Sequence, residues 1–204
     1  MKRLLLSLTV VMAMLVVLTS CAKQPTQEMN DSKAAIDAVL AEGGEKYAKE
    51  EVKSLNDQLT AAMDEVKVQD GKFFKNYDKA KEILAKVKSS ADTLKAEIPA
   101  RKEKAKNDAI AALDAAKTAV SDAKALLGKA PKGKGTKADI EAMRADVAGL
   151  EAALTEAQGM IDSEDYLAAT DKANGAKDKA AEVATQITAA MEKAKPAPKA
   201  GKKK

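Results

Sequence analysis

The chain has 204 residues, of which 35 are Lys or Arg and 31 are Asp or Glu, and it contains no His, no Trp and a single Cys. Without histidine the chain lacks the usual general base near neutral pH and the commonest transition-metal ligand. A lone cysteine excludes an intrachain disulfide, so the fold must be held together by packing. We therefore expect a protein that is not an enzyme, with no catalytic residues, metal or cofactor.

The first twenty residues have the composition of a secretory signal peptide. Lys2 and Arg3 precede an apolar run over residues 4–18 that is interrupted only by Ser7 and Thr9. A charged start, a short apolar region and small residues before a cleavage site are the parts of such a peptide. The run is short for a membrane-spanning helix, which needs about 20 residues. Residues 1–20 are therefore predicted to be a cleaved signal.

The end of this segment, Leu18-Thr19-Ser20-Cys21, resembles the lipobox of bacterial lipoproteins. The resemblance implies cleavage between Ser20 and Cys21, attachment of diacylglycerol to the Cys21 thiol, and acylation of the new amino group, typically with palmitate. Two or more acyl chains anchor a protein durably. Ala22 stands where aspartate would imply inner-membrane retention, so we expect outer-membrane anchoring with the body in the periplasm, in a leaflet left open. A plain secretion signal followed by an unrelated cysteine is the other interpretation.

The rest of the chain carries the periodicity of helices. Residues 21–30 are polar and contain Pro25, and we expect them to form a flexible tether. Beyond them apolar residues recur at alternating steps of four and three, which keeps one seam on one side of a helix. No stretch alternates as a half-buried strand does. The sequence predicts an all-α fold without a sheet, built from antiparallel helical hairpins or three-helix, coiled-coil-like bundles. The predicted seams run over residues 48–66, 73–98, 105–126 (through Ala112, Ala119 and Leu126), 140–161 and 166–190.

Glycine and proline residues divide these helices. A first short helix is expected to start near Asn30 or Asp31, either of which could cap it, and to end at Gly43-Gly44. Pro99 either kinks the long helix that contains it or breaks that helix. Turns or loops are expected at residues 69–71, 128–136 and 162–165.

The chain has features of an internal duplication. The seam from Val52 to Val66 has the same spacing as the seam from Val147 to Ile161. If Phe73-Phe74 then corresponds to Tyr166-Leu167, the turn is two residues longer in the first copy. We expect one helical unit over residues 31–98 and a second over residues 99–195. Chance similarity between two alanine- and lysine-rich helices is the alternative explanation.

Two resemblances accompany this pattern. An aromatic residue after each turn, with alanines at helical spacing behind it, resembles tetratricopeptide-like helical hairpins. Residues 31–98 also resemble an uncharacterised alanine-rich domain family of Gram-negative outer-membrane lipoproteins, with a weaker similarity over 105–195 and a departure at Glu42-Gly43-Gly44-Glu45. The resemblance implies a helical lipoprotein domain and supplies no catalytic residues. It rests on Ala34-Ala35-Ile36-Asp37-Ala38, Lys46-Tyr47-Ala48, Leu55, Leu59, Gly71 and Tyr77-Asp78-Lys79-Ala80.

The chain ends in a basic segment, residues 196–204, which we expect to be a disordered tail. Lys202, Lys203 and Lys204 are candidate contacts to the cell wall or to anionic lipid headgroups. The wall-attached helical lipoproteins of enteric bacteria have a C-terminal lysine, and similarity to them implies attachment to peptidoglycan through Lys204. Nucleic acid is not an expected partner, because no aromatic residue is interleaved with these lysines.

These features together predict a lipid-anchored periplasmic helical protein that acts as a structural spacer or a protein-interaction module of the cell envelope. Its expected partners are the membrane, through lipidated Cys21, and an envelope protein or peptidoglycan. Two alternatives stay open at this point: a non-enzymatic carrier of a small ligand, and a peptidoglycan tether. The oligomeric state is also open, since heptad seams pair between chains as well as within one.

Overall fold

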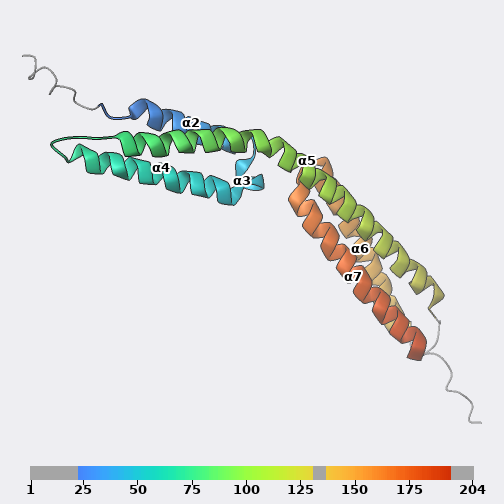
Figure 1. Cartoon of the computed structure of the whole chain (residues 1–204). Helices are drawn as coiled ribbons and strands as arrows, with labels where there is room; N and C mark the ends of the chain where they lie inside the picture. Colours follow the sequence, from blue (N-terminus) through green and yellow to red (C-terminus); the bar gives the residue numbers. More distant parts are fainter. Residues whose placement is uncertain (1–22, 131–136, 194–204) are drawn as a thin grey trace, which may run out of the picture. The chain divides into compact units, whose positions relative to one another are not determined.

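The computed structural model describes residues 23–130 and 137–193, and every regular element in these ranges is a helix. The all-α prediction is confirmed. The chain divides into two units between Arg101 and Lys102, close to the boundary expected after residue 98. Unit 1 holds the first half of α5 and unit 2 holds its second half (Figure 1). In chain order the helices are α2 (Thr26–Ala41), α3 (Gly44–Tyr47), α4 (Lys49–Asp70), α5 (Asp78–Lys129), α6 (Lys137–Asp162) and α7 (Tyr166–Lys193).

Unit 1 is a bundle of α2, α4 and the first half of α5, with the one-turn helix α3 joining α2 to α4 (Figure 1). Its α2 starts beside the end of α4, where Gln24 Nε2 donates a hydrogen bond of 3.0 Å to Asp70 Oδ2. The seams predicted for α4 and α5 supply most of the core, so the spacing argument holds for this unit. The main cluster consists of Ala35, Ile36, Val39, Ala48, Val52, Leu55, Val87, Ala91, Leu94 and Ile98.

A buried serine connects α2 to α5 in this unit. Ser32 is 1% exposed, and its Oγ lies 2.8 Å from the carbonyl oxygen of Glu28 and 2.9 Å from that of Leu84. The hydroxyl is therefore satisfied inside the bundle, as a buried polar group must be. Its small side chain also lets the two helices lie close together.

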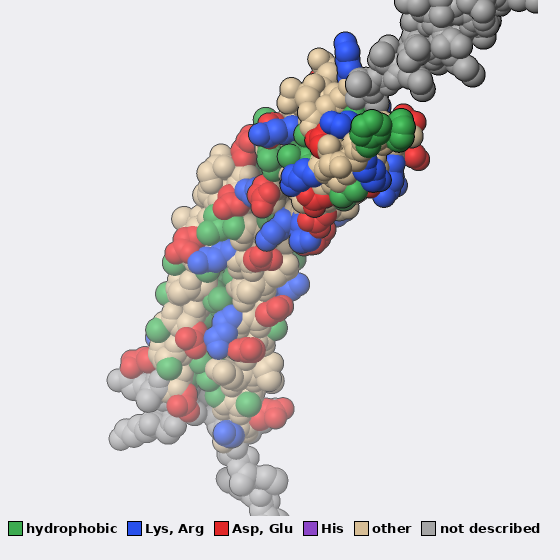
Figure 2. Space-filling view, turned by 90° about the vertical axis from the view of Figure 1, so that its left-hand side faces the viewer, with side chains coloured by type: hydrophobic (Ala, Val, Ile, Leu, Met, Phe, Trp, Pro, Cys, Tyr) green, Lys and Arg blue, Asp and Glu red, His purple; other side chains and the backbone are tan. Residues whose placement is uncertain are grey.

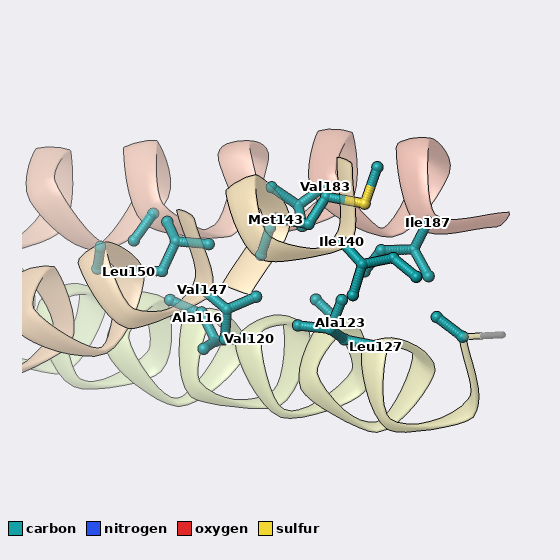
Figure 3. Packing of buried hydrophobic residues seen from close by; sticks show 14 of the residues in the cluster. Ala116, Val120, Ala123, Leu127, Ile140, Met143, Val147, Leu150, Val183 and Ile187 are labelled. Carbon is teal, nitrogen blue, oxygen red and sulfur yellow. The ribbon is translucent and has the colours of Figure 1, made fainter. Parts of the chain in front are cut away.

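Unit 2 is a bundle of the second half of α5 with α6 and α7, and its core mixes alanine with Val, Leu and Ile (Figure 3). The seams predicted for α6 and α7 lie in this core. The predicted seam over 105–126 is confirmed at Ala105, Ala109, Ala116 and Ala123, which are buried. It was wrong by one residue at three positions, because Ala112, Ala119 and Leu126 are only partly buried at the edge of the core. The buried neighbours are larger on average, so this half of α5 buries more apolar surface than expected. They are Leu113, Val120 and Leu127.

The prediction of a flexible tether over residues 21–30 was wrong from Thr26 onward, because α2 begins there and not near Asn30. Pro25 precedes the first helical residue, and a fixed proline φ suits a helix start because the missing N–H is not needed there. Pro25 is also fully buried, and Met29 packs against the small cluster of Val66, Tyr77 and Ala80. Packing thus extends the helix by one turn into a segment whose polar composition suggested a tether.

The turn between α4 and α5 also departs from expectation. The predicted seam begins at Phe73, but Phe73 lies in the turn with 93% of its surface exposed, and Tyr77 is the first buried residue. From Tyr77 onward the buried residues have the same spacing as those from Tyr166 onward. Val66 and Tyr77 are eleven residues apart, whereas Ile161 and Tyr166 are five apart. By this register the first turn is longer by six residues, not two. A tandem duplication stays a prediction.

Helix α5 is continuous through Pro99 and extends to Lys129, so Gly128 and Lys129 belong to it and not to the expected loop. The break considered at Pro99 does not occur. Ile98, beside the proline, is 1% exposed, and Leu94 one turn earlier is 6% exposed. Burial on this face holds the helix together where the proline removes a backbone hydrogen bond.

The two glycines between α2 and α4 are required by local geometry. Gly43 has φ of 99°, in the left-handed region that favours glycine. Gly44 is buried, and a Cβ at its position would lie 2.5 Å from Val39 Cγ1 and 2.8 Å from Val39 O. The positive φ of Gly43 and this close contact of Gly44 together explain the Gly43-Gly44 pair.

Gly44→Ala is expected to lower the free energy of unfolding by about 1–3 kcal/mol, because the added methyl overpacks a fully buried contact. Gly149→Ala is the matched control: Gly149 lies inside α6, and its Cβ would meet nothing within 4 Å. That variant should gain about 0.5–1 kcal/mol from the better helix propensity of alanine. Urea denaturation followed by far-ultraviolet circular dichroism measures both, and equal effects of the two substitutions would contradict the packing argument.

Candidate functional site

The residues singled out from the sequence lie outside the described part of the chain. Ser20 and Cys21 precede residue 23, and Lys202, Lys203 and Lys204 follow residue 193. Lipidation, signal cleavage and wall contact therefore stay predictions. Over residues 23–130 and 137–193, no helix combines the length and apolarity needed to cross a membrane. The same residues contain no group of three or more carboxylate side chains placed to hold a metal ion.

The candidate site is a groove of about 400 Å³ on unit 1, open to solvent between α4 and α5. We call it the α4–α5 groove. No residue of α2 is among those that line it. Buried Leu55 and Leu94 contribute apolar surface to it. The other lining residues are Glu51, Ser54 and Gln58 of α4, and Ser89, Ser90, Thr93, Glu97 and Arg101 of α5.

One half of the groove is lined by uncharged side chains, most of which are short. Ser54 accepts a hydrogen bond of 3.2 Å from Gln58 Nε2, and the Thr93 hydroxyl donates to the Ser89 carbonyl oxygen at 3.0 Å. Most exposed positions of these helices elsewhere carry lysine or a carboxylate. Here Leu55 and Leu94 are only 3% and 6% exposed, and the short neutral side chains above them allow close approach of another polypeptide.

Arg101 closes the other half of the groove. Its Nη1 donates to Glu51 Oε1 at 2.7 Å and to the Tyr47 carbonyl oxygen at 3.3 Å, while Nη2 donates to Glu97 Oε2 at 3.0 Å. The planar guanidinium can serve several acceptors in fixed directions. It therefore ties α3, α4 and α5 together at one point.

The charges of this cluster perturb one another. The hydrogen bond from Arg101 lowers the pKa of Glu51, and the bonds to Glu51 and then Glu97 raise the pKa of Arg101. Two carboxylates and one guanidinium leave a formal charge of −1 at this end of the groove. Binding at this end of the groove is favoured for a ligand group that carries a hydrogen-bond donor or a positive charge.

A second surface lies at the other end of α4, in the turn over residues 71–77, which we call the aromatic turn. Asp70 organises it: Oδ2 accepts from Gln24, Oδ1 accepts from the Tyr77 hydroxyl, and Lys75 Nζ lies 3.8 Å from Oδ1. The hydrogen bond to Asp70, with burial as a smaller cause, raises the pKa of Tyr77 to about 12. Tyr77 itself is 2% exposed. Asp70 thus joins the start of the described chain to the aromatic turn.

Sequence reasoning missed both surfaces. Serine and threonine on a helix surface have no pattern that distinguishes a groove from ordinary solvent exposure. Arg101 and Tyr47 are 54 residues apart, and nothing local links them. The Phe73-Phe74 pair was visible, but the helical period alone suggested burial.

No family model matches the chain, and comparison with curated proteins and with solved structures yields no match either. The resemblance to alanine-rich lipoprotein domains therefore stays a prediction, and any function must be argued from the residues themselves.

Asp70→Asn is expected to move the titration of Tyr77 back toward its ordinary value of 10.0, because the carboxylate that opposes the phenolate is removed. In the wild-type protein, tyrosinate absorbance should include a step near pH 12 that Tyr77→Phe lacks. Since the folded pKa is raised, the stabilisation by neutral Tyr77 is complete below pH 10 and is lost as the pH rises through about 12. An unchanged titration in Asp70→Asn would contradict this assignment.

Proposed function

We propose that this chain is a lipid-anchored helical protein of the Gram-negative cell envelope that acts as a protein-interaction module. In this proposal Cys21 is acylated, the body lies in the periplasm, and the anchor is in the outer membrane. The lipobox-like Leu18-Thr19-Ser20-Cys21, placed after a charged start and an apolar run, supports the anchor. Two helical units without a transmembrane helix in the described residues are compatible with it.

The observation that carries the interaction role is the α4–α5 groove. Its residues on α5 extend from Ser89 to Arg101, twelve positions or about 18 Å of helix. This length suits about three turns of a partner helix, which would pass close to Ser54 and Ser90 above the buried Leu55 and Leu94. The acidic end of the groove would favour a lysine or arginine of the partner.

The carrier alternative is less well supported by this geometry. Small-molecule sites bury most of their ligand, and their walls are predominantly apolar. The α4–α5 groove is open and most of its lining residues are polar. Attachment to peptidoglycan through Lys204 is a separate possibility that the anchoring and crosslinking experiments below can recognise.

Cys21→Ser is expected to release the protein from the membrane fraction, because a serine hydroxyl does not replace the thiol that carries the diacylglycerol. Helical circular dichroism should be unchanged, since the helical bundles pack without the lipid. Fractionation of cells grown with labelled palmitate measures anchoring and acylation together. A Cys21→Ser protein that stays with the membrane, or a wild-type protein without label, would contradict the anchor.

A photo-crosslinking residue at Ser90, in the α4–α5 groove, is expected to capture one defined envelope protein in intact cells. The matched control is the same residue at Ala85, which is exposed on α5 but does not line the groove. Peptidoglycan is digested before analysis, so that a muropeptide mass on Lys204 would identify a wall tether. Capture of a second copy of the chain would make the groove a dimer interface. Identical products at Ser90 and Ala85 would contradict the groove as the contact.

A further inference from the structure

The aromatic turn exposes the only two phenylalanines of the chain. Phe73 is 93% and Phe74 is 82% exposed, and their rings lie edge to face with centroids 5.0 Å apart. Figure 2 faces the end of unit 1 that carries this turn and shows hydrophobic side chains gathered there among Lys, Arg, Asp and Glu side chains. Nothing in the described chain covers the two rings. Keeping two aromatic side chains in water forgoes about 1.5–3 kcal/mol for each ring that could be buried.

The flanking residues fit a negatively charged membrane surface. Lys72 and Lys75 enclose the pair in the sequence Lys72-Phe73-Phe74-Lys75, and both are exposed. Lysine stems can lie along apolar surface while their ammonium groups stay in water or near headgroups. Each lysine close to anionic lipid contributes about 1 kcal/mol. Aromatic rings between lysines therefore combine the apolar and the electrostatic attraction of an interfacial segment.

The position of the turn identifies its partner. Gln24 is hydrogen-bonded to Asp70, three residues before Phe73 in the chain. Cys21 is only three residues before Gln24, and three residues span at most about 11 Å. Acyl chains on Cys21 would therefore enter the membrane next to the end of unit 1 that exposes Phe73 and Phe74.

We infer that the aromatic turn is a second membrane contact, which inserts Phe73 and Phe74 at the boundary between headgroups and acyl chains, in the leaflet that holds Cys21. This inference rests on the proposed lipid anchor. The Asp70 bonds hold Gln24 and Tyr77 beside the turn, so an acylated Cys21, three residues before Gln24, would bring the turn to the same membrane surface. Unit 1 would then be held at two points and not only through the acylated Cys21.

The test uses Phe74→Trp in the acylated full-length protein, placed in vesicles of phosphatidylethanolamine and phosphatidylglycerol. The chain has no natural tryptophan, so the introduced indole is the only one that emits. Its emission should shift to shorter wavelength relative to detergent-free, lipid-free Cys21→Ser protein carrying the same substitution. Lipids brominated near the headgroup end of the acyl chain should quench it. Leu40→Trp is the control: Leu40 is 38% exposed near the end of α2, which has 16 residues or about 24 Å of helix, and its emission should stay unshifted.

The outcomes separate the inference from the proposed function. Mass spectrometry of the N-terminal peptide establishes whether Cys21 is acylated. Acylated protein in which Phe74→Trp is neither shifted nor quenched would overturn the membrane contact and leave the anchor intact. Absence of acyl chains would overturn the anchor and this inference with it. A shift in native envelopes but not in pure lipid vesicles would assign the phenylalanines to a protein partner and also overturn the inference.

Discussion

Close packing of apolar side chains at alternating steps of three and four is the constraint on which both units depend. In α7 the buried positions are mostly alanine, from Ala169 to Ala190, with Val183 and Ile187 between them. An alanine buries far less apolar surface than a leucine, and each buried methylene is worth only about 0.8 kcal/mol. The free energy of burial must therefore be summed over many residues. The lengths of the packed helices agree with this, because α4, α5, α6 and α7 have 22 to 52 residues. Alanine also has the best intrinsic helix propensity, so long helices cost little to form.

The continuity of α5 shows a balance that the sequence could not decide. Proline inside a helix costs about 3 kcal/mol, because a backbone hydrogen bond is lost and the ring meets the preceding turn. Around Pro99 the opposing contributions are tertiary: Ile98 is buried, and Arg101 binds Glu97 across the proline and Glu51 on α4. An exposed pair adds little alone. Here it accompanies the bond to the Tyr47 carbonyl and the burial of Ile98, so the helix persists at a place where the sequence left kink and break equally open.

The sequence was sufficient for the fold class and for most of the core, because the spacing of apolar residues is a local property. It failed where two apolar residues stand side by side. At the three missed positions of 105–127 an alanine or a leucine precedes the buried residue, and period alone does not choose between Leu126 and Leu127. Partners decide that choice, and they come from α6 and α7. The candidate site was less predictable still. The α4–α5 groove depends on which serines of two helices line the same space, and the bond from Gln24 to Asp70 joins residues 46 apart.

The early start of α2 bears on how an anchored protein would present the groove. With helix from Thr26, only residues 22–25 separate Cys21 from the bundle, and five steps of chain span at most about 18 Å. The entry side of unit 1 is therefore held near any surface that contains Cys21. The groove begins at Gln58, twelve residues or about 18 Å along α4 from Asp70 and the aromatic turn. A partner in the groove would thus be bound at a defined distance from the surface that contains Cys21. The stiffness of α4 and α5 would fix that distance better than a flexible tether of the same length. In such an anchored protein, spacer and interaction module would be one role, since the helix that would separate the groove from the membrane is the helix that forms it.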